Sequence, residues 1–179
     1  VLSGVELLQE INHELGLATP TSHRELLATL NTYLLQEKGE GRRVVLVVDE
    51  AQALDGSILE QLRLLSNLET DTAKLIQIVL VGQPELRDLL ARPELAQLNQ
   101  RITVRWHLLP LDGAETEAYV RHRLATASDG KARPTFSSGA LRQIYRYSEG
   151  VPRLINIACH RALLVAYTAE SETVTALPI

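Results

Sequence analysis

The chain has 179 residues, of which 45% are hydrophobic, 22% are charged and only 4% are aromatic. This length allows one globular domain, or one domain with a small accessory part, around a core of aliphatic side chains. The formal net charge is −4 and there are only three lysines, which argues against strong non-specific binding of nucleic acid. No apolar stretch approaches the roughly 20 residues of a membrane-spanning helix.

Two amphipathic helices are predicted before the first strand. Each starts with a capping box, in which a serine (Ser3, then Ser22) is followed three residues later by a glutamate. Apolar residues then recur at helical spacing as far as Leu15 in the first helix and Leu34 in the second. The polar, glycine-containing residues 38–41 form a turn that leads into the strand.

The run Val-Val-Leu-Val-Val at residues 44–48 is followed by Asp49 and Glu50. An apolar run without alternation predicts a strand that is buried on both faces of a parallel sheet. Such strands deliver functional residues at their carboxyl ends, and hydrated Mg²⁺ with nucleotide phosphates would balance two adjacent carboxylates there. The pattern is typical of a Walker B motif, in which Asp49 holds the metal and Glu50 polarises the attacking water. A core strand followed by an acidic turn is the alternative.

The βαβ rhythm continues from residue 57 to residue 109. A third capping box at Ser57 opens a helix that ends near Leu68, and residues 75–81 form a second buried strand that ends at Gly82 and Gln83. Pro84 suits the first turn of a helix, which places Gln83 near the helix cap, and a capping role can coexist with a functional one. After a short helix from Pro93, Arg101 precedes a third strand over residues 102–109, with Trp106 expected in the core.

The character of the chain changes after Pro110, where three helices follow without a strand. They are expected to begin after Asp112, which forms a capping box with Glu115, after Ser137 and at Pro152. We therefore predict an α/β domain with a three-layer parallel sheet at residues 1–109 and a small all-helical subdomain at residues 110–179. Cys159 is predicted to be a small buried hydrophobe, and a single cysteine cannot form an internal disulfide.

The order of these features resembles the core and lid of AAA+ P-loop ATPases, and in particular the ATPase domain of the general secretion pathway protein A (ExeA) family. The resemblance runs from before residue 44 to about residue 168. Five blocks carry it, and they are specific only in combination: residues 47–52, 64–69, 82–86, 100–102 and 150–156.

The resemblance implies a role for each matching residue. Asp49 and Glu50 match the Walker B pair, with ATP and Mg²⁺ as the implied ligands. Gln83 matches the sensor that touches the γ-phosphate or the attacking water, where many relatives have Asn, Ser or Thr. Arg101 matches the arginine that reaches the nucleotide of a neighbouring subunit, which implies a homo-oligomer, and Arg153 matches the lid sensor. A solvent-exposed arginine is the alternative for both Arg101 and Arg153.

The sequence departs from the family at the phosphate-binding loop. No Gly-x-x-x-x-Gly-Lys-Ser/Thr motif is present, and the only lysine that follows a glycine, Lys131, lacks the earlier glycine. Either the loop lies upstream in a longer parent protein, which we favour, or this is a degenerate relative that no longer binds nucleotide. Under both explanations we expect weak or no ATPase activity from these 179 residues alone.

The resemblance implies a soluble ATPase segment on the cytoplasmic face of the bacterial inner membrane, in a type II secretion assembly protein. Other parts of such a protein would contact inner-membrane partners and peptidoglycan and help to place the secretin. Related pilus and exopolysaccharide ATPases share these blocks. A DNA-associated AAA+ regulator of the transposition type is a second hypothesis, although the net charge makes nucleic acid an unlikely partner. A non-catalytic scaffold is the third.

Overall fold

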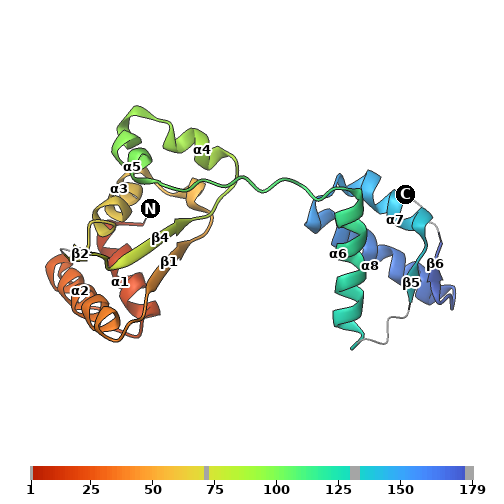
Figure 1. The fold of residues 1–179 in the computed structure, drawn as a ribbon, viewed down its shortest axis with the longest axis horizontal. Coiled ribbons are helices and arrows are strands. Elements are labelled where there is room, and N and C mark those ends of the chain that lie inside the picture. The colour runs from red at the N-terminus through yellow and green to blue at the C-terminus, as the bar shows by residue number, and fades with distance from the viewer. Residues whose placement is uncertain (1, 71–72, 130–133, 176–179) are drawn as a thin grey trace. The chain divides into compact units, whose positions relative to one another are not determined.

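A computed structural model of the protein describes residues 2–70, 73–129 and 134–175 (Figure 1). The described chain divides into two compact units, Val1–Arg105 and Trp106–Ile179. We had predicted the domain boundary a few residues later, after residue 109. Among the described residues, no helix combines the length and the hydrophobicity needed to cross a membrane.

The first unit packs its helices against one face of a short parallel sheet (Figure 1). Its elements in chain order are α1 (Gly4–Glu14), α2 (His23–Gly39), β1 (Val44–Val48), the 3₁₀ helix η1 (Ala51–Ala53), α3 (Gly56–Leu65), β2 (Glu69–Thr70), β3 (Ala73–Lys74), β4 (Ile76–Leu80), α4 (Glu85–Leu90), η2 (Pro93–Leu95) and α5 (Ala96–Arg101). Leucines that are fully buried, such as Leu26, Leu30 and Leu59, form the centre of its core.

The helix starts agree only partly with the prediction. At α1 both capping-box bonds form, since Glu6 N–H donates to Ser3 Oγ at 3.2 Å and Ser3 N–H donates to Glu6 Oε2 at 2.7 Å. Ser22 does precede α2 but makes no side-chain cap bond. The capping box predicted at Ser57 is wrong, because α3 begins at Gly56 and its N-cap is Asp55, two residues before Ser57.

The two strands predicted to be parallel neighbours are confirmed. β1 pairs with β4 in parallel from Val44 opposite Ile76 to Val48 opposite Leu80, and the β2–β3 hairpin lies just before β4 in the chain. The connection through α3 makes this a βαβ unit, as the sequence rhythm indicated.

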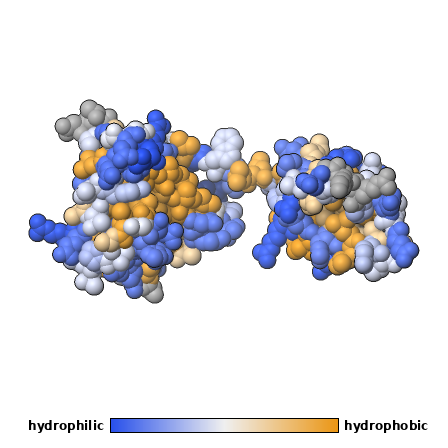
Figure 2. Space-filling model, turned by 90° about the horizontal axis from the view of Figure 1, so that it is seen from below, coloured by the Kyte–Doolittle hydropathy of each residue, from blue (hydrophilic) through white to orange (hydrophobic). Residues whose placement is uncertain are grey.

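Burial on both faces of these strands is not what the structure shows. Side chains alternate between faces in a pleated strand, and only one face, with Leu46 and Ile78, packs on the helices. On the other face Val45 is 50% exposed, Val47 is 60% exposed, and Val79 and Val81 are also exposed. No described element covers this second face, and hydrophobic side chains reach the surface of the first unit (Figure 2).

The third strand predicted over residues 102–109 is absent. α5 ends at Arg101, and residues 102–112 have no regular secondary structure. Trp106, expected in the core, is 85% exposed, and Val104 and Leu108 are exposed with it. Strand propensity is expressed only against a pairing neighbour, and no described strand lies beside this segment.

The second unit contains three helices, where an all-helical subdomain was predicted, together with two short strands. It consists of α6 (Gly113–Ala127), β5 (Thr135–Phe136), α7 (Ser138–Ser148), α8 (Pro152–Thr168) and β6 (Thr173–Val174). The capping box between Asp112 and Glu115 forms with both of its bonds. The parallel pairing of β5 with β6 was not predicted, because two-residue strands leave no periodic signal in the sequence.

Candidate functional site

The carboxyl ends of β1 and β4 bring the predicted acidic pair close to the predicted sensor. Val81 N–H donates to the carbonyl oxygen of Val48 at 2.8 Å, and Ala51 N–H donates to the carbonyl oxygen of Val81 at 2.9 Å. These bonds extend the parallel pairing beyond the strands themselves. Asp49 and Glu50 therefore lie beside Gly82 and Gln83, at the sheet edge where parallel α/β folds hold their ligands.

Asp49 and Glu50 are both exposed at this edge. Glu50 adopts a left-handed backbone conformation, with φ of 51° and ψ of 34°. This conformation is uncommon for residues other than glycine, and such strain concentrates at functional sites. Asp49 Oδ1 accepts the main-chain N–H of Glu50 at 2.8 Å, which fixes one oxygen of that carboxylate.

Gln52 connects the two halves of the site, and sequence reasoning gave it no role. Its Nε2 donates to Glu50 Oε2 at 2.5 Å, and its Oε1 accepts the main-chain N–H of Gln83 at 3.0 Å. The only feature of the sequence that could have indicated a role for Gln52 is its place two residues after a Walker B glutamate. The contact with Gln83 depends on how β1 and β4 pair, so the sequence alone could not reveal it.

Gln83 follows β4 and lies one residue before the N-cap of α4, which is Pro84. No side-chain cap bond forms at this N-cap. The main-chain carbonyl of Gln83 accepts the N–H of Leu86 at 2.9 Å, so its backbone supports the first turn of the helix. The exposed side chain of Gln83 is thus not needed to cap α4.

Arg101 is not brought to the acidic pair of its own chain. It is the exposed last residue of α5, and its positive charge contributes to lowering the pKa of Glu69. The larger cause of that lowered pKa is the hydrogen bond from Lys74 to the Glu69 carboxylate. Glu69 belongs to the hairpin that precedes β4, at the end of the strand opposite to Gln83.

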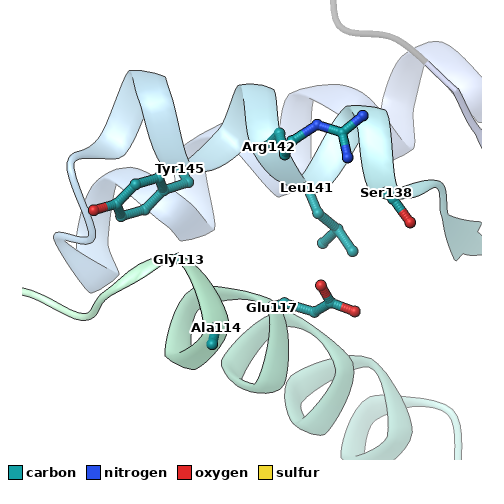
Figure 3. Close-up of a pocket in the computed structure, with 7 residues that line it drawn as sticks. All are labelled: Gly113, Ala114, Glu117, Ser138, Leu141, Arg142 and Tyr145. Atoms are coloured by element: carbon teal, nitrogen blue, oxygen red, sulfur yellow. The ribbon is translucent and has the colours of Figure 1, made fainter.

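Arg153 belongs to the second unit, where it is exposed in the first turn of α8, directly after Pro152. The same unit has a groove of about 250 Å³ between the start of α6 and α7 (Figure 3). Glu117 and Arg142 lie on opposite sides of this groove, and Glu117 is engaged by Arg121 at 2.7 Å. The groove contains none of the residues that the sequence singled out.

The donor set at the sheet edge fits a magnesium ion. Mg²⁺ is usually held by one or two carboxylates and completes its shell with water and substrate phosphates. Asp49 and Glu50 would supply those carboxylates, and Asp49 has one oxygen that does not accept the Glu50 N–H. Within the described ranges, no cluster of three or more His, Cys, Asp or Glu side chains could hold a metal by itself.

The sequence and the fold of this chain have relatives among known proteins. Residues 3–90 match the AAA domain family. The chain is 50% identical over 149 residues to general secretion pathway protein A of Aeromonas hydrophila, which covers 83% of this chain and 27% of that protein.

Solved structures with the same fold share little sequence with this chain. The ORC2 protein of Aeropyrum pernix in its ADP form gives a TM-score of 0.69 at 17% identity, covering 97% of this chain and 47% of the other. Cdc6p of Pyrobaculum aerophilum gives a TM-score of 0.66 at 17% identity, covering 96% of this chain and 47% of the other. The RuvB Holliday junction branch migration motor of Thermotoga maritima gives a TM-score of 0.57 at 16% identity, covering 95% of this chain and 63% of the other.

The fold is that of an AAA+ P-loop protein of the α/β class, as predicted. Within that class the chain is similar to general secretion pathway protein A, and it spans about a quarter of that protein's length.

Proposed function

We propose that this chain carries the hydrolysis side of an ATPase site, within a secretion-associated AAA+ protein. The observation that carries the proposal is the meeting of Asp49, Glu50 and the Gln83 loop at one sheet edge, with Gln52 bonded to both sides. The likeness to general secretion pathway protein A supports the secretion context.

In this proposal Asp49 holds Mg²⁺, directly or through water, and Glu50 accepts a hydrogen bond from the attacking water and polarises it. Mg²⁺ supplies charge neutralisation on the phosphates of ATP when it is bound. Gln83 orients the water or contacts the γ-phosphate from the tip of β4. Because these 179 residues contain no Gly-x-x-x-x-Gly-Lys-Ser/Thr motif, we expect weak or no ATPase activity from them alone.

Arg101 acts on a neighbouring subunit in this proposal. It is exposed and lies away from its own carboxylates, which suits an arginine that completes the site of another copy. Such an arginine stabilises charge on the transferred phosphoryl group and contributes about 10³–10⁵ in rate. Arg153 is proposed to be the sensor residue of the helical lid. The lid is proposed to be residues 110–179 and the core residues 1–109.

The parent protein would use ATP to switch the geometry of its oligomer at the cytoplasmic face of the inner membrane. Segments outside this chain would pass that change to an inner-membrane partner and to peptidoglycan, where the secretin is placed. These assignments rest on the likeness to the secretion protein and on the exposed position of Arg101.

The test is ATP turnover by the parent protein, compared with its Glu50→Gln and Arg101→Ala variants. We expect Glu50→Gln to bind ATP without hydrolysing it and Arg101→Ala to lose turnover only in the assembled form. Arg24→Ala, which removes an exposed arginine of α2, is the matched control and should keep full activity. A parent protein that neither binds nor hydrolyses ATP would favour the non-catalytic scaffold instead.

A further inference from the structure

The amide of Gln52 joins the proposed catalytic glutamate to the main chain that carries the proposed sensor. We propose that Gln52 is a positioning residue, which holds the Glu50 carboxylate at a fixed position relative to the main chain of Gln83, just after β4. This inference rests on the proposed function and deepens it, because it names the group that sets the geometry of the base.

Both halves of the Gln52 amide are used. Nε2 donates to the Glu50 carboxylate at 2.5 Å, and Oε1 accepts the Gln83 N–H at 3.0 Å. A hydrogen bond to an ionised carboxylate is stronger than one between neutral groups, so it restricts the rotation of Glu50. The link to Gln83 is to the backbone, so any shift of the loop after β4 is passed to Glu50.

The backbone around Gln52 is rigid enough for this role. Ala51 is fully buried, and its N–H is bonded to the Val81 carbonyl at 2.9 Å. Ala53 N–H donates to the Glu50 carbonyl at 2.8 Å, which closes the 3₁₀ turn of η1. Gln52 therefore projects from a fixed turn, and Glu50 is held in its left-handed conformation on one side of it.

Gly82 provides the space that the Gln52 side chain occupies. A β-carbon at Gly82 would lie 2.5 Å from Gln52 Oε1, closer than non-bonded atoms approach. The same β-carbon would lie 3.2 Å from Leu86 Cδ2 and 3.3 Å from Gln52 N. Since Oε1 is the end of a flexible side chain, an alanine at residue 82 would push the amide away. The main-chain N of Gln52, at 3.3 Å, would need to shift by only a few tenths of an ångström.

Four variants of the parent protein test the role of Gln52. Gln52→Ala removes both bonds, and Gly82→Ala displaces the amide without altering Gln52. Gln52→Glu keeps an acceptor for the Gln83 N–H but replaces the donor to Glu50 with a repelling carboxylate. Gln36→Ala is the matched control, because Gln36 also donates from Nε2 to a glutamate, Glu40, on the exposed surface of α2.

The readouts are kcat and KM for ATP and the deuterium exchange of peptides that contain the Gln83 amide. We expect Gln52→Ala and Gly82→Ala to lower kcat about tenfold with little change in KM, and to speed exchange at Gln83. Gln52→Glu should lower kcat at least as much while exchange at Gln83 stays slow. Gln36→Ala should match the wild type in all three measurements.

The outcomes separate this inference from the proposed function. If Glu50→Gln abolishes turnover but Gln52→Glu leaves kcat unchanged, then Gln52 only supports the fold and the inference is wrong. The same holds if Gln52→Ala changes neither kcat nor exchange at Gln83. If the wild-type parent hydrolyses no ATP, the proposed function fails first and the positioning role falls with it.

Discussion

The main chain of Leu111 lies directly against the α-carbon of Gly150. Leu111 N–H donates to the Gly150 carbonyl at 2.9 Å, and a β-carbon at Gly150 would lie 1.8 Å from the Leu111 carbonyl oxygen. Gly150 also has φ of +79°, a conformation that favours glycine. This contact ties the segment before α6 to the turn between α7 and α8.

We therefore expect Gly150→Ala to lower the free energy of unfolding of the second unit by about 2–4 kcal/mol. Positive φ accounts for about 1 kcal/mol of this and the clash with backbone for the remainder. Urea unfolding followed by circular dichroism measures the change. Gly139→Ala is the control, since a β-carbon there would make only ordinary contacts, the nearest at 3.7 Å. Equal stability of the two variants would contradict the close approach at Gly150.

Adjacent leucines of α2 provide a matched test of the first core. Leu34 is fully buried and Leu35 is 44% exposed, so truncating each to alanine removes the same atoms from different environments. We expect Leu34→Ala to lower the free energy of unfolding by about 2–5 kcal/mol and Leu35→Ala by less than about 1 kcal/mol. The comparison uses the midpoints of denaturant unfolding curves that have the same slope. A similar loss of unfolding free energy in the two variants would show that α2 packs on another face.

The ion pair of Glu37 with Arg42 predicts a pH-dependent part of the stability. Arg42 Nε and Nη2 donate to the Glu37 carboxylate at 2.5 and 2.6 Å, and these bonds hold the pKa of Glu37 below its ordinary value. A lowered folded-state pKa means that the contribution is present above the ordinary pKa and is lost as pH falls through the lowered one.

Glu37→Gln should therefore destabilise the chain at pH 7, and the difference from wild type should shrink below roughly pH 4, near the ordinary pKa of glutamate. Thermal unfolding at a series of pH values measures this difference. Glu14→Gln, an exposed position at the end of α1, is the control for loss of one negative charge. A difference that stays constant down to acid pH would exclude the ion pair as its cause.

Cys159 is expected to react slowly with alkylating reagents. Burial raises the pKa of its thiol to about 11, and the positive charge of Arg123 offsets this only in part. The thiolate is the reactive form, so little is present near pH 7 and its share rises with pH. Iodoacetamide labelling should therefore be slow at pH 7.5 and accelerate up to about pH 11. The denatured chain should label at the rate of an ordinary thiol, and fast labelling of the folded chain would contradict this expectation.

Local sequence patterns predicted where most helices and strands form better than they predicted how those elements are buried and paired. The runs that became β1 and β4 were recognised because β-branched residues gather there, but their burial on both faces was overestimated. Residues 102–109 carry an equally good strand pattern and form no strand, since pairing needs a neighbour that no local pattern supplies. The boxes at Ser3 and Asp112 formed, whereas Ser57 lost its capping role to an earlier residue, Asp55.

The sequence by itself determined the helices, the two parallel strands and the carboxylates at the end of the first, because side-chain periodicity and turn chemistry are local properties. Only the tertiary structure decided that Gln52 bridges Glu50 and Gln83, that Gly82 leaves room for its amide and that Arg101 lies away from the acidic pair. Gln52 and Gln83 lie 31 positions apart in the chain, and relationships of this kind arise from strand register and helix packing.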